Sequence, residues 1–143
     1  MAPTLILDTS VLIAGLRSSL GASFVLLDLV GTGRFTIGLS AALVLEYEAT
    51  CMKSLPALNL TGDEIRELLD YFCRVGKLSA IRFQVRPSVA DPDDELVLEA
   101  AIATGSDWIV THNIRDIAAG AARYGIEVIT PREALRRLEL KHE

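Results

Sequence analysis

The stretch LILDTSVLIAGL, residues 5–16, places an aspartate directly after a short apolar run. Residues 4–7 are typical of a buried strand, and residues 11–17 are typical of a helix that follows it. This strand-to-helix step is how a parallel α/β unit begins. Asp8, at the turn, has two possible roles: it could cap the helix by accepting hydrogen bonds from free backbone amides, or it could belong to a site at the carboxyl end of the strand.

The rest of the chain also alternates between strand and helix patterns. Further strands are expected at 35–39, 78–85, 108–110 and 127–129, and helices at 22–30, 41–53, 62–75, 92–104, 116–124 and from Pro131 onward. Ser40 is the expected cap of the helix 41–53, and Thr61 with Glu64 is the expected capping box of the helix 62–75. The apolar helix 22–30 is expected to be buried, and a proline-containing turn is expected before Thr61. We therefore expect an α/β fold in one domain, residues 1–143, with a mostly parallel five-stranded sheet and helices on both faces.

Composition narrows the class of protein. The apolar runs fall far short of the roughly 20 residues that span a bilayer, and no N-terminal targeting pattern is visible. We therefore expect a soluble, cytoplasmic protein with no membrane partner. Cys51 and Cys73 suggest buried thiols rather than a disulfide framework or a zinc site. The net charge of −5 argues against broad electrostatic attachment to nucleic acid.

The segment DPDDELVLEAA, residues 91–101, is the strongest start of a helix. Asp91 is the expected cap and Pro92 the first helical position. Asp94 precedes three apolar residues at spacings of three, four and seven, so it should lie on the side that packs on the sheet, whereas Glu95 and Glu99 should point outward. A carboxylate at the top of a buried face is costly unless it is paired, hydrogen-bonded or bound to a metal, which makes Asp94 a candidate ligand.

Two further regions carry candidate acids. Glu46 and Glu48 follow the second strand, and helical geometry turns them to nearly opposite sides, so at most one can face a site; the pattern does not choose between them. In WIVTHNIRDI, residues 108–117, a strand ends near Thr111 and a polar turn follows. Asp116 could cap the next helix or join a site, and His112 is expected to be a solvent-facing turn residue.

These acids are expected to meet at one edge of the sheet. Asp8, Asp94 and Asp116 lie beside the carboxyl ends of strands, and Glu46 follows another strand. In a parallel sheet these ends share one edge, where ligands bind. Converging carboxylates repel one another, and hard divalent cations such as Mg²⁺ or Mn²⁺ stabilise them. The pattern therefore predicts a divalent metal site.

Three segments together resemble the PIN domain, a metal-dependent ribonuclease fold found in toxin components of toxin–antitoxin pairs. They are LILDTSVLIAGL, LSAALVLEYE and DPDDELVLEAAIATGSDWIVTHNIRD, which span nearly the whole chain. The DPDD and EY segments are most similar to a toxin subgroup distinct from the shorter VapC-like toxins. The resemblance selects Glu46 over Glu48, because Glu46 lies six residues after Ser40. It implies an acidic quartet with four supporting residues: Asp8, Glu46, Asp94 and Asp116, supported by Ser10, Asp91, Thr111 and Asn113.

The resemblance also implies a function. It suggests hydrolysis of RNA with Mg²⁺ or Mn²⁺, leaving a 5′ phosphate and a 3′ hydroxyl, in a homodimer with a cognate antitoxin partner. Arg34, Arg115 and the basic tail are expected to contact the RNA backbone. The family often has a second acid or a glycine where this chain has His112 and Asn113, so we expect a weakened second cation site.

Other functions fit the sequence less well. Receiver domains need a lysine near the last strand, where this chain has Thr130 and Pro131, and aspartate-nucleophile phosphatases need a second aspartate at the position of Ser10. Neither a Walker loop nor GxGxxG is present, which disfavours a nucleotide-binding module. A PIN-like scaffold that binds RNA or a partner protein without cleavage remains the alternative.

Overall fold

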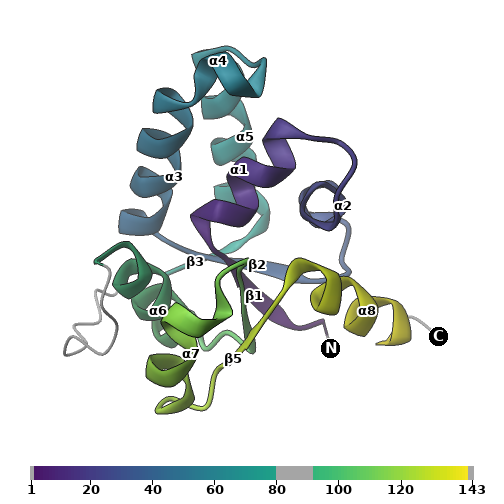
Figure 1. Ribbon diagram of the computed structural model, residues 1–143, viewed down its shortest axis with the longest axis vertical. Coiled ribbons are helices and arrows are strands. Elements are labelled where there is room, and N and C mark those ends of the chain that lie inside the picture. The colour runs from purple at the N-terminus through teal and green to yellow at the C-terminus, as the bar shows by residue number, and fades with distance from the viewer. Residues whose placement is uncertain (1, 80–91, 142–143) are drawn as a thin grey trace.

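The computed structural model describes residues 2–79 and 92–141 and has an α/β fold (Figure 1). The elements are β1 (Thr4–Leu7), α1 (Thr9–Arg17), α2 (Ala22–Leu29), β2 (Thr36–Ser40), α3 (Ala41–Lys53), α4 (Leu55–Leu58), α5 (Gly62–Val75), β3 (Lys77–Ser79), α6 (Pro92–Thr104), β4 (Trp108–Val110), α7 (Ile114–Ala122), β5 (Glu127–Ile129) and α8 (Pro131–Lys141). The predicted α/β class is confirmed.

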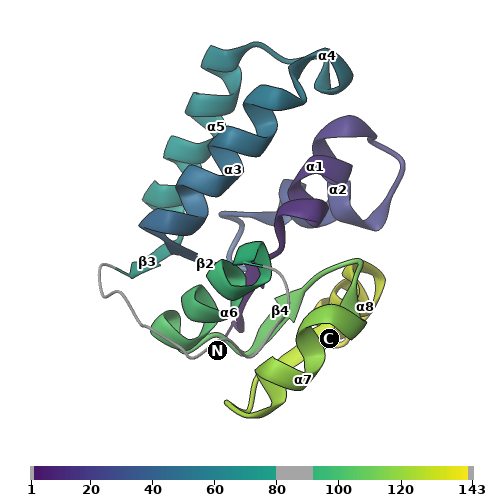
Figure 2. The same cartoon turned by 60° about the vertical axis from the view of Figure 1, so that its left-hand side comes forward.

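The strands form one five-stranded parallel sheet in the order β3-β2-β1-β4-β5. Strand β1 is central, and Leu5 pairs with Ile37 of β2 and with Trp108 of β4. In both views α3 and α5 extend side by side away from the sheet, and α6 and α7 lie next to each other (Figures 1 and 2). Leu5, Ile6 and Leu7 are at most 1% exposed, so the core lies around β1. Because all strands run in one direction, their carboxyl ends share one edge.

The capping bonds predicted from the sequence form at the starts of two helices. The predicted capping box forms: Glu64 N donates to Thr61 Oγ1 at 3.1 Å, and Thr61 N donates to Glu64 Oε1 at 3.0 Å, so α5 begins at Gly62. Ser40 Oγ accepts a bond from Leu43 N at 3.1 Å and caps α3 as expected. These bonds satisfy backbone amides that have no partner within the helix.

Helix α2 corrects one expectation. It ends at Leu29 and is not a buried helix: Ser23 and Leu26 are buried, but Phe24 and Val25 are 38% and 43% exposed. The helix packs against α1 and α8 at the periphery of the fold, so one side stays open to solvent. The apolar sequence of α2 predicted a helix buried all round, but its packing buries only one face.

Other boundaries also moved. The expected turn before Thr61 contains the four-residue helix α4. The strand expected at 78–85 begins at Lys77, and residues 80–91 lie outside the described residues. Helix α7 begins at Ile114, two residues before the predicted start, and Asn113 occupies its N-cap position without a side-chain capping bond.

Two features bear on the expectations from composition. Cys51 is buried as expected, whereas Cys73 is only half-buried, and neither forms a disulfide.

Among the described helices, none is by itself long and apolar enough to cross a membrane. Helices α1 and α2 meet that test only as a pair, with a bend of 100° between them.

Candidate active site

Asp8 lies at the carboxyl end of the central strand. Its backbone N–H donates to Val110 O at 2.9 Å, which fixes its main chain against β4. Its Oδ2 accepts hydrogen bonds from Ser10 Oγ at 2.7 Å and from Thr111 Oγ1 at 2.8 Å. Asp8 occupies the N-cap position of α1 but makes no side-chain capping bond, so the capping role is wrong. Its carboxylate is instead anchored by two hydroxyl groups at the edge of the sheet.

Thr111 links Asp8 to the turn after β4. The Thr111 side chain is nearly fully buried, and its Oγ1 also accepts a bond from Asn113 N at 3.0 Å. The side-chain amide of Asn113 in turn donates to the carboxylate of Asp116. Asp116 lies in the first turn of α7 and is not its cap. The structure thus joins Asp8 and Asp116 through two supporting residues, Thr111 and Asn113.

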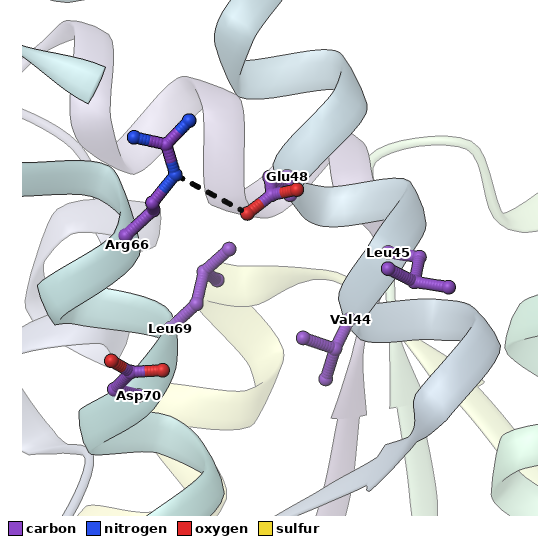
Figure 3. Close-up of a pocket in the computed structure, with 6 residues that line it drawn as sticks. All are labelled: Val44, Leu45, Glu48, Arg66, Leu69 and Asp70. Carbon is purple, nitrogen blue, oxygen red and sulfur yellow. Dashed lines mark ion pairs between the residues drawn. The ribbon is translucent and has the colours of Figure 1, made fainter. Parts of the chain in front are cut away.

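Glu46 and Glu48 lie on different sides of α3, as helical geometry requires. Glu48 faces α5, where its Oε2 lies 3.8 Å from Arg66 Nε in a groove lined by both apolar and charged side chains (Figure 3). Glu46 is half-buried and accepts a bond from Thr50 Oγ1 at 3.0 Å. Helix α3 also packs against α1 and α6, which carry or adjoin the other candidate acids. Glu48 is therefore paired with Arg66 in the groove between α3 and α5, and Glu46 does not take part in that pair.

Asp94 lies near the start of α6 and is half-buried. The apolar face predicted for this helix is confirmed, since Val97, Leu98 and Ala101 are at most 1% exposed. Glu95 and Glu99, expected to point outward, are half-buried like Asp94, so burial alone does not single out Asp94. The expected cap Asp91 lies outside the described residues.

Two hydrogen-bond contacts near the edge were not predicted from the sequence. Tyr47 is fully buried, and its hydroxyl donates to the backbone carbonyl of Leu7, the residue before Asp8. Burial, and then the negative charge of Asp8, raise the pKa of Tyr47, so its hydroxyl stays protonated and donates. His112 is exposed as expected, but its Nε2 lies 3.0 Å from Oγ of the buried Ser23. In both contacts the two partners lie far apart in sequence, so no local pattern predicted that they would meet.

The candidate ligands suit a divalent cation that keeps some of its water better than a cation held by protein side chains alone. Within residues 2–79 and 92–141, no three histidine, cysteine or acidic side chains lie close enough to hold one metal ion. Mg²⁺ commonly keeps several waters and uses one or two carboxylates together with substrate phosphates. Both hydroxyls on Asp8 bond to the same carboxylate oxygen, Oδ2. The residues therefore fit a divalent ion held by one or two carboxylates and water.

Comparison with known proteins identifies the family. Residues 4–115 match the PIN domain family. This chain belongs to the PIN-domain family. The matched range holds Asp8, Glu46, Asp94, Thr111 and Asn113, and the expected PIN resemblance is confirmed. PIN domains are typically nucleases, which places this one among the hydrolases at a coarse level.

A solved structure supports the PIN fold. The crystal structure of VapBC2 from Rickettsia felis bound to a DNA fragment from their promoter contains a chain that aligns with a TM-score of 0.56 and 17% identity. The alignment covers 89% of this PIN domain and 98% of that chain. At this identity the likeness is one of fold. None of the curated proteins compared matches the sequence.

Proposed function

We propose that this PIN domain is a Mg²⁺- or Mn²⁺-dependent endoribonuclease and the toxin component of a toxin–antitoxin pair. The observation that carries the proposal is the anchored carboxylate of Asp8, which is held by Ser10 and Thr111 and linked through Asn113 to Asp116. Membership of a family of nucleases, and a fold shared with a chain of the VapBC2 structure, support the same function.

The chain's own residues have distinct parts in this proposal. Asp8 presents Oδ1 to the cation because Oδ2 is held by the two hydroxyls. Asn113 fixes the direction of the Asp116 carboxylate. Glu46 and Asp94 complete the acidic quartet as ligands or as groups that place the attacking water. When bound, a divalent ion lowers the pKa of its water and stabilises charge on the leaving oxygen.

The substrate we propose is RNA, recognised mainly through its backbone. Arg115 lies beside Asp116 on α7 and is exposed, so it can contact a phosphate next to the carboxylates. Two cations of the basic tail are already used: Arg136 pairs with Glu133 at 2.5 Å, and Arg137 pairs with Glu127 at 2.7 Å. Because these two arginines are already paired, Arg115 is a better candidate than the basic tail to contact the RNA backbone.

Cleavage of RNA by the purified chain tests the proposal. We expect cleavage with Mn²⁺ and none with a chelator, and a 5′ phosphate on the product. Asp8→Asn should lower the rate by more than about 100-fold, because loss of a ligand should exceed the 10- to 100-fold effect of an outer-shell residue.

Asp107→Asn is the matched control. Asp107 Oδ2 accepts a bond from Thr4 N at 2.9 Å at the opposite end of β1, and an asparagine oxygen can accept the same bond. This variant should cleave like the wild type. If the wild type shows no metal-dependent cleavage, or if Asp8→Asn cleaves equally fast, the nuclease proposal is wrong and a binding scaffold is favoured.

The toxin role, which implies a cytoplasmic location, and the homodimer are two separate parts of the proposal. A toxin should arrest growth when expressed, Asp8→Asn should not, and a small neighbouring gene should encode an antitoxin that restores growth. Light scattering of the purified chain should give twice the 15.5 kDa mass of one chain. Failure of either test removes that part and leaves the nuclease proposal in place.

A further inference from the structure

Tyr47 connects two elements that carry candidate ligands. Its ring is fully buried on α3, and its hydroxyl donates to the carbonyl of Leu7, the last residue of β1. Leu7 directly precedes Asp8, and Tyr47 directly follows Glu46. One buried hydrogen bond therefore joins the residue beside one candidate ligand to the residue beside another, across 40 positions in sequence.

The environment of this bond makes it well suited to fix a distance. The ring packs into the core, so it has little freedom to move. A buried carbonyl that loses its donor is left unsatisfied, which disfavours any arrangement in which α3 shifts along β1. The bond is made by main chain on one side and by a rigid ring on the other, so it sets the position of the backbone at Asp8 relative to α3.

We infer that Tyr47 is a positioning residue, which holds Glu46 against Asp8 at the separation that a shared divalent cation needs. The inference rests on the proposed metal-dependent function and adds to it a residue that touches neither metal nor substrate. Tyr47 acts through backbone placement, whereas Ser10 and Thr111 act directly on the Asp8 carboxylate.

Mn²⁺ affinity of the folded protein, measured by titration calorimetry without RNA, tests this role. Tyr47→Phe removes only the hydroxyl, and we expect the Kd for Mn²⁺ to rise about 10-fold or more, as for other residues that orient metal ligands. Tyr71→Phe is the matched control: Tyr71 on α5 also donates to a backbone carbonyl, that of Val30, at 3.1 Å. Its Kd should equal that of the wild type.

A double-mutant cycle sharpens the test. If Tyr47 acts by placing Glu46, Glu46→Gln should raise the Kd by itself, and adding Tyr47→Phe to it should raise the Kd further by much less than in the wild type. Additive effects would overturn the role, as would an unchanged Kd for Tyr47→Phe or an equal loss in Tyr71→Phe. A wild type that binds no Mn²⁺ would also overturn it.

A measurement on the unmutated protein covers the case in which Tyr47→Phe does not fold. The chain has three tyrosines, so labelling the tyrosine Cζ with ¹³C gives three resonances, which Tyr71→Phe and Tyr124→Phe assign. Titration with Mg²⁺ should shift the Tyr47 resonance and leave the other two in place; no shift would overturn the role. If the wild type binds Mn²⁺ but cleaves no RNA, the proposed nuclease function fails while these readouts still decide the part of Tyr47.

Discussion

The two ends of β1 use aspartate differently. At the amino end, Asp107 accepts a bond from the backbone N–H of Thr4, so its carboxylate completes the main-chain bonding of the strand. At the carboxyl end, Asp8 accepts bonds from the side chains of Ser10 and Thr111. The first arrangement uses a carboxylate to satisfy the backbone. The second uses two side chains to hold a carboxylate in one orientation.

Two buried threonines repeat this contrast. Thr104, at the amino edge, donates to Ala100 O at 2.8 Å and lies 2.6 Å from Ser106 Oγ, and it closes the end of α6. Thr111, at the carboxyl edge, donates to the Asp8 carboxylate and accepts from Asn113 N. Polar side chains at the amino edge thus stabilise a turn, whereas those at the carboxyl edge orient a charge. This difference marks one edge as the site.

Among the tests of this comparison, replacing each threonine by valine should give the largest difference in Mn²⁺ binding and RNA cleavage. Thr111→Val should weaken Mn²⁺ binding and RNA cleavage by 10- to 100-fold, because it removes a hydroxyl that orients a ligand. Thr104→Val should leave both unchanged and lower the free energy of unfolding by about 1–3 kcal/mol, since buried groups lose their partner. Calorimetry with Mn²⁺ and urea unfolding of both variants measure these effects. Equal metal binding by the two variants would remove the contrast.

Ser10→Ala should have a smaller effect than Thr111→Val. Ser10 is exposed, so water can replace its bond to Asp8. We expect cleavage and Mn²⁺ affinity to fall less than about 10-fold, below the usual outer-shell effect. Ser18→Ala, at the other end of α1, removes a bond from Leu20 N and should change neither quantity. An effect as large as that of Thr111→Val would mean that the exposed hydroxyl dominates the orientation of Asp8.

The smallest effect should come from α8, where charges pair with one another. Hydrogen bonds from Arg136 and Arg137 lower the pKa of Glu133 from 4.5 to about 2. A lowered folded-state pKa adds stability above the ordinary value, and this stability is lost as the pH falls from 4.5 toward 2. Glu133→Gln should therefore reduce stability slightly at pH 7 and hardly at all near pH 2. Because these pairs face solvent, salt should shrink the difference.

Urea midpoints of the wild type and Glu133→Gln at pH 7 and pH 2, each with and without added salt, check this expectation. Mn²⁺ binding at pH 7 should be the same in both proteins. A loss of metal affinity in Glu133→Gln would show that α8 is coupled to the carboxyl edge, and the comparison of the two edges would have to include it.

The sequence by itself determined most of the fold. The strands Thr4–Leu7, Trp108–Val110 and Glu127–Ile129 lie where the apolar runs predicted them. Capping at Ser40 and Thr61 fixed two helix starts. These signals act within a few residues, so they can be read along the chain. The alternation of strands and helices then predicted a parallel sheet, with Asp8, Asp94 and Asp116 at one edge of it.

Only the tertiary structure decided what each side chain does at that edge. Thr111 bonds to Asp8 across 103 positions, and Tyr47 bonds to Leu7 across 40. Local sequence predicted a capping role for Asp8 as readily as a site, and it predicted burial for a helix that packs on one face. Such contacts depend on how helices and strands pack against one another, and the chain order alone does not specify those distances.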